Sequence, residues 1–321
     1  MSAFGHVTAT AHRRPSSTAL LVGLPLLAAL LGAMLALAFG GNAGEAPGRA
    51  SAAPAAGTVS AGDLRLTLPD GWTPARTGPD VPGFEGAPKA FAHSWNADVV
   101  IALLPAARRS LLPAQLDTAK SPASARPRVA RAGALSAYHY VRAPKGQRVL
   151  DVVVVPTTQG IATIACSSAV LAPYECDLAL DTLRLARGSF LALNADAAFL
   201  VRLPAVAATL DAQRVRLRAR LARTSLPDAA ARAAAGLAGA YAAAGRALRP
   251  LAAPRGEAAA TVRLLDRLRD RYGALAGALR APDRDAFAAA ARAIARDESR
   301  LAARLEGWQR VLALPGSGRA G

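Results

Sequence analysis

The sequence predicts three parts in order: an N-terminal transmembrane helix, an α+β domain built on antiparallel strands, and an all-α C-terminal domain. Three observations lead to this interpretation. A stretch of apolar residues without a charge occupies residues 19–39. Short segments that alternate apolar and polar residues follow it, as half-buried strands require. From Ser189 onward, apolar residues recur at steps of three and four, which is typical of amphipathic helices.

The apolar stretch is long enough to cross a bilayer, because its residues span roughly 31 Å as a helix at 1.5 Å per residue. Arg13 and Arg14 precede it, and no basic residue follows it directly. The positive-inside rule therefore places residues 1–18 in the cytoplasm and the bulk of the chain outside it. A retained single-pass anchor and a signal that is cleaved before secretion both fit, since small residues typical of cleavage sites occur at residues 36–38 and 41–43.

The α+β domain is expected over residues 63–187, after a flexible linker at 40–62 that is rich in Gly, Ala, Pro and Ser. The strongest strand signals, joined by a hairpin turn at 157–160, lie at Val149–Val155 and Ile161–Cys166. Further strands are predicted at Leu64–Leu68, in two segments between Phe91 and Leu104, and at Leu135–Arg142. A short helix is predicted at Leu111–Lys120 and a closing helix at Glu175–Leu185.

One short motif in this domain points to a known family. The opening Leu68-Pro69-Asp70-Gly71-Trp72, the meander of strands and the final helix resemble the PsbP-like fold, which also occurs in LpqN-type actinobacterial envelope proteins. The resemblance covers residues 63–186. It implies an antiparallel sandwich whose use is mostly to bind other proteins, and it carries no binding residue over to this chain.

Cys166 and Cys176 are the two cysteines of the chain. An exported protein meets conditions that allow a disulfide, and a bridge closing about ten residues contributes about 2–3 kcal/mol in the chain-entropy model. A metal site needs three or four ligands, and the histidines are few and scattered. A redox pair usually has a two-residue spacing. The pair is therefore predicted to be a structural disulfide.

The helical domain is expected over residues 188–314, with a disordered tail at 315–321. Four helices are delimited by Pro, Gly and capping residues. Their short connections predict antiparallel neighbours, and hence a four-helix bundle or paired helical hairpins. The predicted helices run from about Phe190 to Arg223, from Pro227 to Leu248, from Glu257 to Arg280, and from Asp283 to Leu314.

Two polar residues, Gln213 and Glu298, fall on otherwise apolar helix faces. A buried carboxylate needs a partner. One interpretation is a polar site inside the bundle that includes Tyr241 and Tyr272. The other is that the helix drifts, so that Glu298 faces solvent beside Arg292 or Arg296.

Arginines dominate the charge of the chain, which has a formal net charge of +17. Residues 187–321 hold 23 arginines against 11 acidic residues. Such a surface favours anionic partners, although solvated helix faces and a GC-rich genome also produce this pattern. Arg263, Arg267 and Arg271 form a stripe with Asp266 and Asp270 at ion-pair spacing, which predicts a salt-bridged face.

Catalytic motifs are missing: the sequence has no Gly-rich phosphate loop, no Gly-x-Ser-x-Gly and no Ser-x-x-Lys. A histidine–carboxylate pair is possible between His93 or His139 and Asp98 or Asp151, with half-exposed strand histidines as the alternative. The helical domain contains no histidine, which disfavours a metal site there. We therefore expect no catalytic residue, cofactor or metal.

The function predicted from these observations is that of a non-enzymatic, membrane-anchored, extracytoplasmic binding or scaffold protein of the cell envelope. Its expected partner is another envelope protein or an anionic envelope polymer. One alternative is anionic-polymer or nucleic-acid binding through the Arg-rich helical domain, although export argues against intracellular nucleic acid. A second alternative is a hydrolase whose motif is not recognised.

Overall fold

The computed structural model describes residues 57–116, 127–132, 135–141, 148–169, 175–281 and 283–313. The predicted membrane segment at 19–39, the N-terminus predicted to be cytoplasmic, most of the predicted linker, the end of the helix predicted at 111–120 and the predicted C-terminal tail lie outside these residues. Among the helices that are described, none has the length and apolar character needed to cross a membrane.

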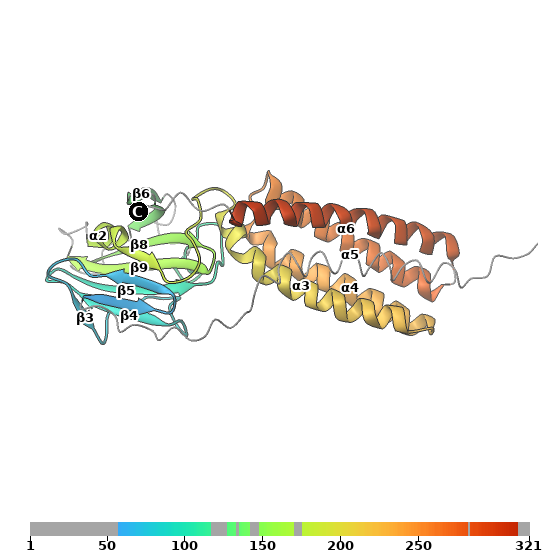
Figure 1. The fold of residues 1–321 in the computed structure, drawn as a ribbon, viewed down its shortest axis with the longest axis horizontal. Coiled ribbons are helices and arrows are strands. Elements are labelled where there is room, and N and C mark those ends of the chain that lie inside the picture. The colour runs from blue at the N-terminus through green and yellow to red at the C-terminus, as the bar shows by residue number, and fades with distance from the viewer. Residues whose placement is uncertain are drawn as a thin grey trace, which may run out of the picture. The chain divides into compact units, whose positions relative to one another are not determined.

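A seven-stranded antiparallel sheet forms the centre of the α+β domain (Figure 1). Its strand order is β3-β4-β5-β9-β8-β7-β6. The predicted hairpin is confirmed between β8 and β9, where the Thr157 hydroxyl accepts hydrogen bonds from the amides of Gln159 and Gly160 (both 3.1 Å). The strands are β3 (Thr73–Ala75), β4 (Lys89–His93), β5 (Ala97–Leu104), β6 (Arg128–Ala132), β7 (Leu135–Val141), β8 (Arg148–Thr157) and β9 (Gly160–Ala169).

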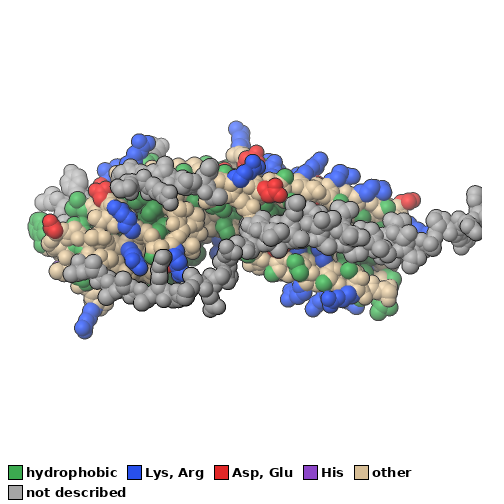
Figure 2. Space-filling view, in the orientation of Figure 1, with side chains coloured by type: hydrophobic (Ala, Val, Ile, Leu, Met, Phe, Trp, Pro, Cys, Tyr) green, Lys and Arg blue, Asp and Glu red, His purple; other side chains and the backbone are tan. Residues whose placement is uncertain are grey.

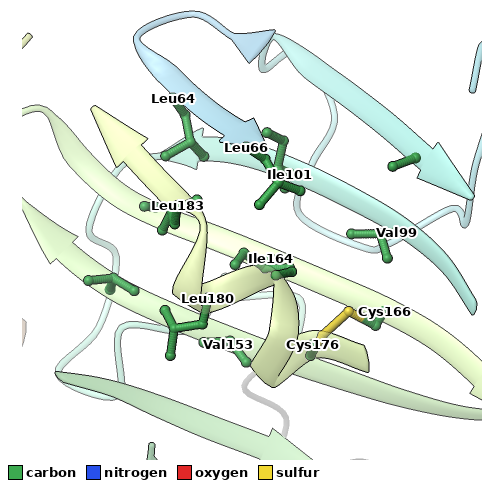
Figure 3. Close-up of a cluster of buried hydrophobic side chains, with 14 of the residues drawn as sticks. Leu64, Leu66, Val99, Ile101, Val153, Ile164, Cys166, Cys176, Leu180 and Leu183 are labelled. Carbon is green, nitrogen blue, oxygen red and sulfur yellow. A yellow bond between two sulfur atoms is a disulfide. The ribbon is translucent and has the colours of Figure 1, made fainter. Parts of the chain in front are cut away.

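A smaller antiparallel sheet and a short helix accompany one face of the large sheet. The small sheet has the order β1-β2-β10, from Thr58–Ala61, Leu64–Thr67 and Leu183–Leu185. The helix, α2 (Glu175–Asp181), contacts β8 and β9. Side chains from both sheets and from α2 form one buried apolar cluster that includes the disulfide (Figure 3). This packing explains why the weak strand β2 forms, since Leu64 and Leu66 are fully buried in it.

The opposite face of the large sheet is also covered. A cross-strand row of Val100, Ala165, Val152 and Tyr140 lies on this face, and all four side chains are buried. The Tyr140 hydroxyl donates a hydrogen bond to the carbonyl of Ser110 (2.5 Å), which brings the loop after β5 over this row. Both faces of the central strands are therefore covered from solvent. Accordingly, β8 and β9 have the near-continuous apolar runs that such burial requires.

Three local predictions in this domain are wrong. The predicted linker at 40–62 contains a strand, because β1 pairs with β2 from Thr58 onward. The helix predicted from Leu111 is replaced by turns over 111–116, since Leu111 has a φ of 64° and Pro113 disfavours a helical residue before it. The closing helix ends at Asp181, and the following residues pair with β2 as β10 instead.

The helical domain is a bundle of four long helices that run antiparallel to their neighbours (Figure 1). The first begins at Ala197, later than predicted, whereas the predicted third helix has the observed bounds. Large aromatic side chains pack between the first and last helices, where the ring centres of Phe199 and Trp308 lie 5.4 Å apart. The helices are α3 (Ala197–Arg223), α4 (Pro227–Leu248), α5 (Glu257–Arg280) and α6 (Arg284–Ala313), with a short 3-10 helix, η2 (Arg249–Leu251), after α4.

Candidate functional site

A cluster of polar side chains lies inside the helical bundle and draws on all four helices. Its centre is the Glu298 carboxylate of α6. Oxygen Oε1 accepts hydrogen bonds from the hydroxyls of Tyr241 on α4 (2.7 Å) and Tyr272 on α5 (2.8 Å). Two arginines of α3 complete the set, since Arg218 donates a hydrogen bond to the same oxygen and Arg214 Nη2 lies 3.7 Å from it. We call these five residues the bundle cluster.

Burial of the bundle cluster is nearly complete. Glu298 is 6% exposed and Arg214 is 3% exposed. A charge taken out of water is tolerated only when it is paired and hydrogen-bonded. Here the carboxylate has two phenols and two guanidiniums around it. Arg214 has Asp211 as a further acidic neighbour at 3.5 Å, and its guanidinium carbon lies 5.9 Å from the centre of the Tyr241 ring.

These contacts shift the ionisation of the cluster. Burial acts to raise the pKa of Glu298, but Arg218, Arg214 and the two tyrosine hydroxyls outweigh it, so this pKa lies below its ordinary value. Burial, together with the negative charge of Glu298, raises the pKa of Tyr272 and that of Tyr241 above the ordinary value. The favoured state is therefore an ionised glutamate with two neutral tyrosines that donate to it.

The structure brings together three of the four residues predicted for a polar site, and it leaves out Gln213. Gln213 is half-buried in a groove between α3 and α4, beside residues such as Thr209 and Ala244. The alternative in which Glu298 faces solvent is wrong. Sequence reasoning missed Arg214 and Arg218, although both follow the apolar residue Leu210 at the four-residue steps that continue its face.

The bundle cluster is suited to fixing the helices relative to one another. The Tyr241 and Tyr272 rings stack with their centres 5.5 Å apart, which packs α4 against α5. The Glu298 carboxylate on α6 contacts both tyrosines and Arg218, and so links these two helices to α3. Its hydrogen-bonding groups are largely occupied by each other. In the described part of the chain, the one cluster atom buried without a hydrogen-bond partner is Arg214 Nε. Such a buried and mutually paired arrangement is suited to specifying the register of the helices.

A second feature of the domain is a concentration of arginines at the junction of α5 and α6, which we call the basic seam. Arg267 and Arg271 of α5 lie 4.0 and 3.9 Å from the carboxylate of Asp297 on α6. Arg300 lies 3.3 Å from the same carboxylate. Two residues of the predicted stripe, Arg267 and Arg271, thus lie beside an acidic residue that was not predicted, Asp297. Asp266 and Asp270 pair instead with Arg249 and Arg269.

Two histidine–carboxylate groups occur in the α+β domain. His93 Nδ1 lies 2.6 Å from Asp98 Oδ1 on the surface, where Arg148 also binds Asp98 (2.7 Å). His139 is buried, so the alternative in which the strand histidines are half-exposed is wrong for this residue.

The environment of His139 is polar on both sides of its ring. Its Nε2 lies 3.5 Å from the buried Asp151, and its Nδ1 accepts a hydrogen bond from Arg128 (2.7 Å). Arg128 also reaches Asp177 of α2 (2.9 Å), so this group helps to attach α2 to the sheet. In the residues that the structure describes, no three His, Cys, Asp or Glu side chains are grouped so as to hold a metal ion.

The predicted disulfide is confirmed. Cys166 of β9 and Cys176 of α2 are bonded and fully buried (Figure 3). The bond fastens the start of α2 to the face of the large sheet.

Comparison with known proteins gives no relative. No family model, no curated protein and no solved structure matches the chain.

Proposed function

We propose that the chain is a non-enzymatic binding or scaffold protein of the cell envelope, held outside the cytoplasm by residues 19–39. In this proposal residues 63–186 belong to the PsbP-like fold, and the helical domain presents surfaces to a partner. Another envelope protein or an anionic envelope polymer is the partner that fits.

The observation that carries the proposal is the buried disulfide between Cys166 and Cys176. Disulfides persist in oxidising compartments and are rare in the cytosol, where thiols are kept reduced. The bond therefore supports export, which the uncharged segment and the preceding arginines also favour.

Binding is favoured over catalysis by the division of polar groups in the helical domain. The buried ones in the bundle cluster are paired with each other, whereas many arginines are exposed. Basic side chains line the edges formed by α3 and α6 (Figure 2).

A tryptophan on the α+β domain offers a further point of contact. Trp95 is 85% exposed in the turn between β4 and β5, and the turn is held by the Ser94 hydroxyl, which accepts from the amide of Ala97 (3.0 Å). Exposed tryptophan on an ordered turn is typical of a contact residue in protein interfaces.

Location is tested first. In fractionated cells the full chain is expected in the membrane fraction, and in spheroplasts it is expected to be degraded by an added protease. Its cysteines are expected to react with a maleimide only after denaturation with a reductant. An intact soluble product with two freely alkylated thiols would contradict the proposal.

Partner binding is tested by photocrosslinking in intact cells. A photoreactive residue at Trp95 is expected to give a discrete adduct, whereas one at the exposed polar residue Asp70 serves as the matched control. A protein that stays alone and monomeric with probes at Trp95 and at exposed positions of the bundle would count against a scaffold.

A further inference from the structure

The geometry points to the basic seam as a binding site for a linear phosphorylated polymer. This inference rests on the proposed function, because it gives the chemical class of a partner met outside the cytoplasm. It follows from the charge, exposure and spacing of the side chains between α5 and α6.

Positive charge is in excess at the basic seam. Three guanidiniums, from Arg267, Arg271 and Arg300, converge on the one carboxylate of Asp297. Asp297 is 5% exposed, so it forms the floor of the seam below the arginines. These four side chains together carry a net charge of about +2. The nearby carboxylate of Asp270 also interacts with Arg271, but it is paired with Arg269 at 2.8 Å, so positive charge remains available to an external anion.

The arginines of the basic seam are available to such a ligand. The side chains of Arg267 and Arg271 are 49% and 50% exposed, and that of Arg300 is 65% exposed. Arg263 and Arg296, each one turn earlier on its helix, are exposed as well and lengthen the two rows. Neighbours within a row are about 6 Å apart along the helix axis. Phosphates spaced at intervals along an extended chain, such as every second phosphate of a polyphosphate, can therefore each meet a guanidinium.

The composition of the seam favours a polymer over a membrane surface or a single-stranded nucleic acid. Membrane-surface helices combine basic residues with exposed apolar ones that enter the lipid. Among the described residues, the large apolar side chains that are most exposed on the helical domain are Val215 on α3, Leu226 before α4 and Val311 at the end of α6, and none belongs to the turns that carry Arg267, Arg271 and Arg300. The seam also lacks exposed aromatic rings among the described residues, and such rings are what unpaired bases stack on.

Binding of inorganic polyphosphate to the full chain in uncharged detergent tests the inference. We expect binding that weakens steeply with salt. Replacing two seam residues, Arg267→Gln with Arg271→Gln, is expected to weaken it at least about tenfold at low salt and to reduce the slope of log K against log salt by about two. The matched control is Arg232→Gln with Arg246→Gln on α4, which removes the same charge from exposed positions and is expected to cost less than about threefold.

A second variant tests the role of the carboxylate floor. Asp297→Asn keeps the size of the side chain and an acceptor oxygen, but it removes the negative charge beneath the ligand. Polyphosphate binding is expected to become about threefold tighter. Circular dichroism of each variant establishes that the bundle remains folded.

Several outcomes would overturn the inference. Absence of binding at low salt would do so, as would equal losses in the seam and control variants, because binding would then reflect diffuse charge. Stronger binding to phosphatidylglycerol vesicles than to polyphosphate, lost in the same seam variant, would assign the seam to a membrane surface. If polyphosphate does not bind at the seam, the expected crosslinking at Trp95 and the expected location of the chain are unaffected. The failure of this inference is therefore distinguishable from the failure of the proposed function.

Discussion

At the scale of single residues, Glu298 shows how a charge is accommodated in a core made mostly of Ala and Leu. Its position on the apolar face of a helix could be predicted, as could the two tyrosines. Extending the heptad pattern beyond Leu210 places Gln213, and not an arginine, on the core-facing side of the helix. A straight α-helix has 3.6 residues per turn, so its core-facing side drifts away from a strict 3.5-residue repeat. Arg214, one residue further along, therefore occupies the core-facing position.

Replacement of the central carboxylate should be costly. Glu298→Gln leaves Arg218 without its negative partner and leaves Arg214 with Asp211 alone, and we expect a loss of about 3–5 kcal/mol in the free energy of unfolding. Urea denaturation followed by circular dichroism measures it. Glu306→Gln, an exposed change on the same helix, is the control and should stay within about 0.5 kcal/mol. A loss for Glu298→Gln no larger than the control's would show that the cluster adds nothing to stability.

The same residues predict how stability depends on pH. The folded pKa of Glu298 is lowered, so its contribution is present above the unfolded pKa of about 4.5 and is lost as the pH falls through the folded value. The folded pKa values of Tyr241 and Tyr272 are raised, so their contribution is present below about pH 10 and is lost above it. Denaturant unfolding across this pH range should show both declines. Glu298→Gln should flatten the acid decline, and the tyrosinate absorbance that appears only on unfolding should be reduced when Tyr241 and Tyr272 are replaced by Phe.

At the scale of elements, the long helices were predictable and the shortest strands were not. Proline and glycine mark the ends of α4 and α5, and each helix carries its own periodic signal. Strands β1, β3 and β10 have three or four residues, too few for alternation to stand out. Their formation depends on a pairing partner elsewhere in the chain, as when β10 pairs with β2.

The disulfide should stabilise the attachment of α2 to the sheet. Replacing both residues, as in Cys166→Ala with Cys176→Ala, should lower the free energy of unfolding by about 2–3 kcal/mol, since the bridge closes a short loop in the unfolded chain. The same loss should follow from reductant in the unmodified protein and be absent from the double variant. A reductant effect that persists without the cysteines would contradict this assignment.

Two glycines of α4 provide a matched test of helix packing. A Cβ added at Gly239 meets no atom within 4 Å, so Gly239→Ala should raise stability by about 0.5–1 kcal/mol through helix propensity. A Cβ at Gly236 would lie 2.9 Å from Leu217 Cδ2 on α3, so Gly236→Ala should gain less because Leu217 must move. Thermal unfolding of both variants measures the difference. Equal gains in stability for the two variants would mean that the Leu217 side chain on α3 can move aside without an energetic cost.

At the scale of the whole molecule, the chain divides its stabilising devices between two kinds of structure. The disulfide belongs to the apolar cluster of the α+β domain, whereas the bundle cluster joins the four helices of the helical domain to one another. The order of strand-rich and helical parts followed from the change of periodicity near Ser189. The basic seam did not, because it is formed by side chains that the fold brings together from separate helices, such as Asp297 and Arg267.

This division predicts additive effects. Combining Glu298→Gln with the cysteine double variant should lower stability by the sum of the separate losses within about 0.5 kcal/mol, because the two sites share no partner. Denaturation of the four proteins under one buffer measures the coupling. A coupling above about 1 kcal/mol would mean that the two sites are energetically linked, through a shared network or a shift of the backbone.

The small sheet has a consequence for how the protein is made. Its central strand, β2, emerges early in synthesis, yet one of its two neighbours, β10, follows only after β3 to β9 and α2 have been made. Until then the nascent chain exposes an open strand edge bordered by Leu64 and Leu66, a site for mispairing with other chains. A polypeptide that leaves the ribosome without Leu183–Leu185 would therefore be expected to bind chaperones, even if the rest of its fold were complete.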